Sequence, residues 1–195
     1  MTVLNPTPGI PGYAFYDAKS RQCFCPQLSS VTISQGALLK IEQYAFYSCS
    51  NIVNVTMSAD SVTSIGSHAF MSCSNLATVT MPDSITSIGA YAFEECGNLK
   101  TVHIGNAVKS IGESAFDKNV ALTSITIPYS VKDIERDAFS GCTSLETIQL
   151  GSNLTNIGYG AFEDAPVRSL VFPPSVKTIG INAFSGCKNL VNATF

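Results

Sequence analysis

The sequence predicts an α/β repeat solenoid, with a parallel β-sheet of about eight strands and short helical or irregular turns on its outer side. The first observation is an Ala-Phe pair that recurs with phenylalanine-to-phenylalanine steps of 31, 24, 23, 23, 23, 23 and 22 residues. The second is an L-x-x-I-x-I element that precedes or follows each pair and alternates as a half-buried strand does. One unit of 23 residues cannot bury its own apolar side chains, so neighbouring units must stack. The phenylalanines are Phe15, Phe46, Phe70, Phe93, Phe116, Phe139, Phe162 and Phe184.

The long first step divides the chain of 195 residues into two parts. Extra residues lie between Phe15 and Cys25, so residues 1–27 are predicted to form an irregular N-terminal coil or cap. Residues 28–195 are predicted to form one continuous solenoid of 23-residue units without a C-terminal cap. The final strand, near Phe195, would leave an open edge, which predicts either a longer protein or self-association through that edge.

Within each unit the elements follow in a fixed order. A strand is expected at each I-x-I triplet, and a proline or glycine then ends it, as at Pro82 and Gly105. A second short strand is expected at the V-x-x-I stretch, for example Val108 to Ile111. One or two helical turns are expected around Ala-Phe, because the remaining residues are too few for a longer helix.

A column of cysteines precedes the strand elements. Six of the seven cysteines lie three residues before the first apolar residue of a strand element, and Asn119 and Ala165 take this place in two units. A position that accepts cysteine, asparagine or alanine needs a small side chain, so reduced, structural thiols are predicted. Cys23 lies outside the column and is predicted to be a free thiol or part of the cap. The column contains Cys25, Cys49, Cys73, Cys96, Cys142 and Cys187.

This pattern resembles the BspA-like leucine-rich repeats, also called the Treponema pallidum type, whose unit reads L-x-x-I-x-I-P-x-x-V-x-x-I-G-x-x-A-F-x-x-C. The resemblance runs from Ile10 to Phe195 over about eight units, with departures at Asn119, Glu135 and Ala165. It implies a leucine-rich-repeat arc with a binding role rather than a catalytic one. It also implies relatives among large surface proteins of bacteria and parasitic protists, linked to adhesion and host contact.

Composition and motifs exclude several functions. Charged residues make up 13% of the chain and the net charge is −3, without a basic patch, so we expect no nucleic-acid partner. No apolar stretch approaches the roughly 20 residues of a membrane helix, so we expect no direct membrane insertion. His68, expected to face solvent, and His103, expected to point away from the core, lie in different columns. We predict no enzyme, no cofactor and no metal site, and solvated acidic pairs at Glu94-Glu95 and Glu163-Asp164.

The outward positions of the strands are the candidate binding surface. They carry hydroxyl and amide groups in two parallel ladders, on the type of surface with which solenoids bind partners. Strand propensity alone also favours threonine there. Tyr129, just past a strand, is the best single anchor for a partner. The predicted site residues are Asn54, Thr56, Thr78, Thr80, Thr101, His103, Ser124, Thr126, Tyr129, Thr147, Gln149 and Ser169.

The sequence is compatible with three functions. The first is a protein-binding module of a surface or secreted adhesin-like protein, whose partner is a host extracellular-matrix or cell-surface protein. The second is a cytoplasmic interaction scaffold, which the expected free thiols favour. The start of the sequence does not resemble a signal peptide, which is compatible with a cytosolic protein, with export by another route and with a piece of a longer protein. The third is carbohydrate or ice binding through the threonine ladders, which His103, Gln149 and Val171 interrupt.

Overall fold

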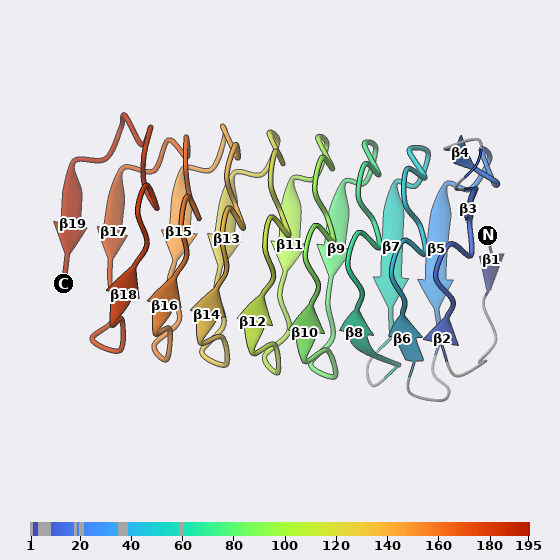
Figure 1. The fold of residues 1–195 in the computed structure, drawn as a ribbon, viewed down its shortest axis with the longest axis horizontal. Coiled ribbons are helices and arrows are strands. Elements are labelled where there is room, and N and C mark those ends of the chain that lie inside the picture. The colour runs from blue at the N-terminus through green and yellow to red at the C-terminus, as the bar shows by residue number, and fades with distance from the viewer. Residues whose placement is uncertain (1, 4–8, 18, 20–21, 35–38, 59–60) are drawn as a thin grey trace.

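The computed structural model describes the chain except residues 1, 4–8, 18, 20–21, 35–38 and 59–60. Coils stack side by side along the long axis, and the two termini lie at opposite ends of the stack (Figure 1). Nearly every coil contributes one strand to each of two parallel rows, so the protein is a β-solenoid. Part of the predicted N-terminal cap, residues 1–27, lies outside the described residues.

One row, here called the first sheet, contains the strands predicted at the I-x-I triplets. Their register places equivalent residues of successive coils side by side, as for Val55 and Val79. Strand β1 (Thr2–Val3) adds an N-terminal member that pairs with β5. The remaining strands are β5 (Ser30–Ile33), β7 (Asn54–Met57), β9 (Thr78–Thr80), β11 (Thr101–His103), β13 (Ser124–Thr126), β15 (Thr147–Gln149), β17 (Ser169–Val171) and β19 (Asn192–Thr194).

The other row, the second sheet, confirms the short strand expected at V-x-x-I. All its neighbours pair in parallel, in the order β18-β16-β14-β12-β10-β8-β6-β2. Two further strands, β3 (Tyr16–Asp17) and β4 (Gln22–Cys23), form an antiparallel hairpin in the N-terminal coil. The second sheet contains β2 (Gly9–Ile10), β6 (Leu39–Ile41), β8 (Val62–Ile65), β10 (Ser87–Ile88), β12 (Ser110–Ile111), β14 (Asp133–Ile134), β16 (Asn156–Ile157) and β18 (Thr178–Ile179).

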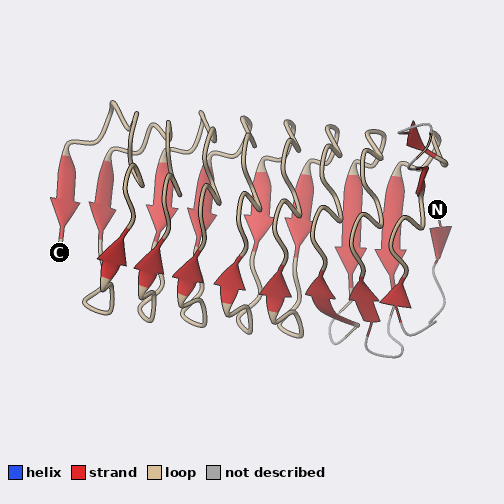
Figure 2. Cartoon of the chain, viewed as in Figure 1, coloured by secondary structure: helices blue, strands red, loops and turns tan. Residues whose placement is uncertain are grey.

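The predicted helical turns around Ala-Phe are wrong, because the described residues contain no helix (Figure 2). Left-handed backbone brackets the pair, as at Tyr91 (φ 60°) and Glu95 (φ 59°), and a right-handed helix cannot pass through such residues. The amides bond between coils instead: Phe93 N–H donates to the Ala115 carbonyl at 2.8 Å. The fold is therefore built from strands and turns, and the α/β class does not hold.

The phenylalanines of the Ala-Phe pairs stack into one continuous column through the core. Neighbouring rings lie 4.9–5.4 Å apart between centroids and within 9° of parallel. The six rings from Phe46 to Phe162 are fully buried. Each coil thus places one aromatic ring against the next, and the solenoid is stabilised between neighbours.

The cysteine column forms hydrogen bonds between coils. The Cys96 thiol donates to the carbonyl of Phe70 at 3.2 Å, and the buried thiols Cys73 and Cys142 repeat this contact with Phe46 and Phe116. Asn119 substitutes its amide, since Nδ2 donates to the Phe93 carbonyl at 2.9 Å. A small donor at this position therefore satisfies a buried carbonyl of the preceding coil.

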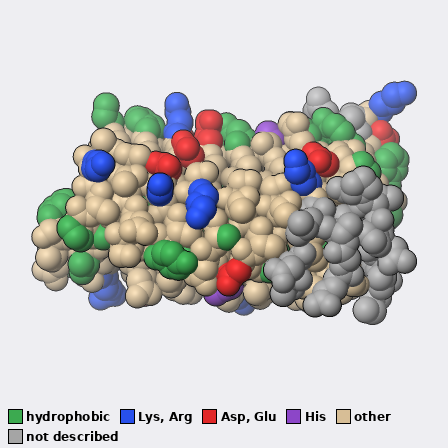
Figure 3. All heavy atoms as spheres, turned by 90° about the horizontal axis from the view of Figure 1, so that it is seen from below, with side chains coloured by type: hydrophobic (Ala, Val, Ile, Leu, Met, Phe, Trp, Pro, Cys, Tyr) green, Lys and Arg blue, Asp and Glu red, His purple; other side chains and the backbone are tan. Residues whose placement is uncertain are grey.

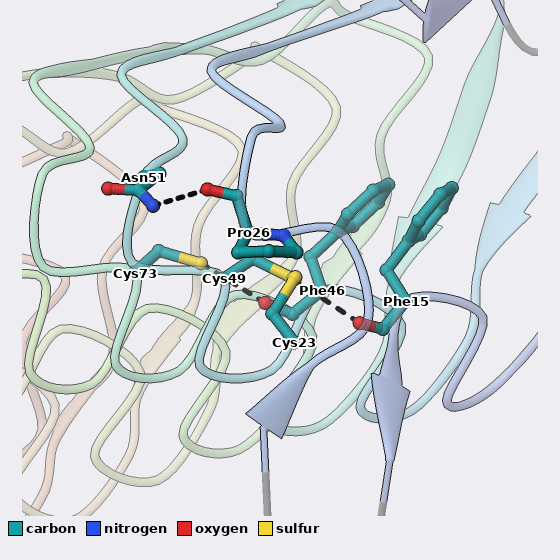
Figure 4. The surroundings of a disulfide bond; sticks show 7 residues. All are labelled: Phe15, Cys23, Pro26, Phe46, Cys49, Asn51 and Cys73. Atoms are coloured by element: carbon teal, nitrogen blue, oxygen red, sulfur yellow. Dashed lines mark hydrogen bonds between the residues drawn. A yellow bond between two sulfur atoms is a disulfide. The ribbon is translucent and has the colours of Figure 1, made fainter.

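The prediction that all seven cysteines are free is wrong for two of them. Cys23 and Cys49 form a disulfide, with their Cα atoms 5.0 Å apart (Figure 4). The extra residues of the first coil fold into the hairpin of β3 and β4, and this hairpin places Cys23 opposite the cysteine column. The regular repeat contains no counterpart of this hairpin, so repeat spacing could not reveal the bond.

Asn119 offers a test of the column. Its Oδ1 atom is buried without a hydrogen-bond partner, which costs about 1–3 kcal/mol. Asn119→Cys removes this oxygen and keeps a donor for Phe93, so we expect about 1 kcal/mol of added stability in a denaturant titration. Asn119→Ala, which leaves the Phe93 carbonyl without that donor, serves as the comparison. A cysteine variant less stable than the alanine variant would refute the hydrogen-bonding role of the column.

Candidate functional site

The first sheet presents a continuous outward face of uncharged polar side chains. In β9, β11, β13, β15 and β17 the middle residue is buried and its two neighbours are exposed. All eleven strand residues predicted for the site are exposed on this sheet, namely Asn54, Thr56, Thr78, Thr80, Thr101, His103, Ser124, Thr126, Thr147, Gln149 and Ser169. The parallel register brings these side chains into two rows that cross the strands.

The side chains of these rows form few hydrogen bonds with one another. The Thr126 hydroxyl donates to Oε1 of Gln149 at 3.3 Å across β13 and β15. His103 stands beside Thr80 in the register, exposed to solvent as expected. Tyr129, in the turn after β13, is 60% exposed. These groups are therefore free to contact a partner.

The backbone ladder of the first sheet is interrupted twice. Neither β11 and β13 nor β15 and β17 are hydrogen-bonded to each other, whereas the second sheet is continuous. Pro128 follows β13 and Pro173 follows β17, and proline has no N–H to donate to the preceding coil. The longer strand β7 keeps its pairing with β9 although Pro82 follows β9.

A hollow of about 570 Å³ lies at the second interruption, between β15 and β17. Its lining includes three predicted site residues, Thr147, Gln149 and Ser169, beside apolar groups of Leu150 and Val171. Val171 is 69% exposed, in a row where the other strands carry threonine, glutamine or histidine. The hollow thus combines an apolar contact surface with uncharged hydrogen-bonding groups. The sequence alone places Val171 at an outward position that interrupts the ladder, and not among the predicted site residues.

His68 departs from its prediction. Its ring is half-buried between Tyr44 and Tyr91, at 4.5 and 4.8 Å from their centroids, instead of facing solvent. Burial lowers the pKa of His68. The ring belongs to a stack that Tyr13 extends, so its role in the structure is packing between coils.

Of the acidic pair Glu94-Glu95, which was predicted to be solvated, only Glu95 is exposed to solvent. Glu94 is buried, and burial raises the pKa of its carboxyl, while Lys118 Nζ lies 3.6 Å from it and 3.3 Å from Glu95. Asp117 lies 3.8 Å from the same ammonium. The group is a cluster of three carboxylates around one ammonium at the surface, where the Lys118 and Glu95 side chains are 56% and 45% exposed.

Charge and metal-binding groups are sparse elsewhere. Figure 3, which views the edge where turns join the two sheets, shows single charged side chains scattered over a mostly uncharged surface. In the described part of the chain, no three His, Cys, Asp or Glu residues lie together in a way that would hold a metal ion. Over the same residues, no helix has the length and apolar character needed to span a membrane.

Comparison with known proteins gives one family. A family model described as the BspA type leucine-rich repeat region, with six copies, matches residues 7–122 and 109–195. No curated protein sequence matches the chain.

Several solved structures share the fold. A leucine-rich repeat protein of Treponema pallidum is 25% identical with a TM-score of 0.67, over 92% of this chain and 79% of that one. One from Bacteroides ovatus is 23% identical with a TM-score of 0.66, over 98% of this chain and 56% of that one. A leucine-rich cell surface protein of Faecalibacterium prausnitzii is 27% identical with a TM-score of 0.55, over 89% of this chain and 63% of that one. The chain thus spans less than two thirds of the last two proteins.

Proposed function

Because the chain belongs to the BspA-type leucine-rich repeat family, we propose that the outward face of its first sheet is a protein-binding surface. The observation that carries the proposal is the hollow between β15 and β17, set in a face of exposed, uncharged side chains. A partner could place an apolar side chain against Val171 and Leu150 while Thr147, Gln149 and Ser169 form hydrogen bonds around it. Interfaces commonly combine such an apolar centre with a polar rim.

The proposed anchors lie at two places on or beside this face. Val171 and Tyr129 are large apolar or aromatic side chains that the solenoid leaves exposed. The other proposed contacts are the strand residues from Asn54 to Ser169 given above. Because the face is nearly uncharged, we expect shape and apolar contact, rather than electrostatic steering, to govern partner choice.

We further propose a surface or secreted location, with an adhesin-like role in host or cell contact. The disulfide between Cys23 and Cys49 supports this location, because disulfides persist in oxidising environments outside the cytosol. The similarity to a protein described as a cell surface protein of Faecalibacterium prausnitzii points the same way. A cytoplasmic scaffold that uses the same face is the alternative, and the disulfide counts against it.

Binding to immobilised extracellular-matrix and cell-surface proteins tests the proposal. We expect Thr126→Glu, which adds a charge to the face, to weaken binding at least tenfold, because a partner would have to desolvate that charge. Ser87→Glu makes a comparable change at an exposed position of β10 on the second sheet and should leave binding unchanged. Equal loss in both variants, or in the β10 variant alone, would contradict a site on the first sheet.

Antibody labelling of intact and permeabilised source cells tests the location separately. Labelling of intact cells is expected. Labelling that requires permeabilisation would favour the cytoplasmic scaffold and redirect the search to cytosolic partners.

A further inference from the structure

The cysteines of the solenoid divide into an inert group and a reactive group. Burial raises the pKa of the Cys73 and Cys142 thiols to about 12, and that of Cys96 well above its usual value. These three thiols are enclosed and donate to carbonyls, so they supply almost no thiolate for reaction. The N-terminal coil differs, because it contains both a disulfide and an exposed thiol.

Three sulfur-bearing residues meet at one hollow of about 250 Å³. Its lining includes both halves of the disulfide, Cys23 and Cys49, and the free thiol residue Cys25. Cys23 is half-buried, whereas Cys49 is only 2% exposed. An attacking thiolate from this hollow therefore has better access to the sulfur of Cys23 than to that of Cys49.

The surroundings of Cys49 offer a hydrogen-bond acceptor to its reduced thiol. Four other cysteines of the column, Cys73, Cys96, Cys142 and Cys187, each donate to the phenylalanine carbonyl of the preceding coil, as Cys73 does to Phe46 (Figure 4). Cys49 Sγ lies 3.7 Å from the equivalent carbonyl, Phe15, but carries no proton while it is bonded to Cys23. A reduced Cys49 would find this acceptor in place, beside the Phe24 N–H that already donates to it at 2.8 Å.

We propose that Cys25 exchanges with the disulfide and thereby removes the covalent link between the N-terminal hairpin and the next coil of the solenoid. The Cys25 thiolate attacks Sγ of Cys23, the Cys23–Cys49 bond breaks, and a Cys23–Cys25 disulfide forms. The electron pair of the broken bond leaves on Cys49, whose thiolate takes one proton and donates to the Phe15 carbonyl. One disulfide is exchanged for another, so the step needs no oxidant or reductant. The inference is independent of the proposed binding function.

Disulfide mapping of the full oxidised chain at two pH values tests the exchange. The protein is incubated at pH 6.5 or 8.5 and quenched in acid. It is then denatured, alkylated with N-ethylmaleimide and sequenced by fragment-ion mass spectrometry. Label on Cys49 is expected to accumulate with time, and faster at pH 8.5 than at pH 6.5, because the thiolate is the attacking species. The peptide of residues 23 and 25 should carry a matching internal disulfide. Cys73, Cys96 and Cys142 are free thiols, so full label on these three residues shows that the alkylation is complete.

The controls separate the alternatives. Cys25→Ser removes the attacking thiol, so Cys49 should stay unlabelled at both pH values. If Cys25 is the only one of Cys23, Cys25 and Cys49 to carry label in the wild-type protein, the proposal is overturned. Label on Cys23 with a Cys25–Cys49 bond would show attack at the other sulfur and would equally overturn it. The wild-type comparison of the two pH values holds even if the variant folds poorly.

Discussion

Replacing Phe116 with alanine is expected to lower the free energy of unfolding by about 3–5 kcal/mol. The Phe116 ring is fully buried and stacks on Phe93 and Phe139, with centroids 5.3 and 5.2 Å away. Removing it opens a cavity at the middle of the phenylalanine column and breaks two ring contacts at once. Because the solenoid is held together between neighbouring coils, a loss at this interface weakens both halves.

The measurement is thermal unfolding followed by circular dichroism. A loss of this size corresponds to a fall of about 6–20 °C in the midpoint for a chain of this length. Phe24→Ala is the matched control, because that ring is 61% exposed and should change the midpoint by little. Equal midpoints for wild-type protein and Phe116→Ala would show that the column does not stabilise the fold.

Gly105→Ala is expected to lower the free energy of unfolding by about 1–3 kcal/mol, because the added methyl group overpacks the space between coils. A Cβ atom at Gly105 would meet the Pro82 carbonyl oxygen, an atom of the backbone that cannot rotate away. Gly151 repeats this contact with Pro128, so prolines and glycines alternate along the edge of the first sheet. Glycine is required there by the close approach of the neighbouring coil.

Gly97→Ala provides the comparison for this prediction. The nearest atom to a Cβ at Gly97 is a side-chain carbon of Val120 at 4.0 Å, so the added methyl group fits. Urea unfolding should therefore separate the two variants. If both alanine variants keep wild-type stability, the coils are not packed as closely as the Pro82 contact requires.

The repeat spacing was sufficient to predict both strands of each coil. Apolar residues at every second position identify the strand at Val102, and the shorter strand that ends at Ile111 follows from the same columns. The outward position of the candidate site residues follows too, because alternation fixes which side chains leave the core. The binding role of these residues is a proposal that periodicity alone does not test.

Other features depend on backbone conformation, which spacing does not report. Residues such as Tyr91 and His68 adopt left-handed φ values without being glycine, so the sequence gives no warning that Ala-Phe cannot be helical. Because of that conformation, successive coils bond through the Ala-Phe segment and His68 stacks between two tyrosines. Because the Ala-Phe segment is a short apolar run, its sequence does not distinguish a helical turn from another conformation.

The hollow and the disulfide arise where the repeat is irregular. The Cys23–Cys49 bond depends on the hairpin of β3 and β4 in the first coil. The extra residues that form this hairpin have no equivalent in the 23-residue units, so aligning the units with one another gives no information about them. The hollow lies between β15 and β17, where the step between coils is 22 residues and proline follows β17. Pro128 and Pro173 follow the strands at the two interruptions and are visible in the sequence, but Pro82 follows a strand that keeps its pairing, so proline alone does not identify an interrupted ladder.

Hydrogen–deuterium exchange with and without a bound partner tests the claim that the first sheet is the binding surface. The partner is a protein that binds in the matrix and cell-surface panel. Amides that point into the gap between β15 and β17 lack a strand partner there and should exchange readily in the free protein. We predict that binding slows exchange in residues 147–152 and 169–173 and leaves the second-sheet strands β10 and β12 unchanged. Slowed exchange in β10 and β12, without any change at the hollow, would contradict the claim.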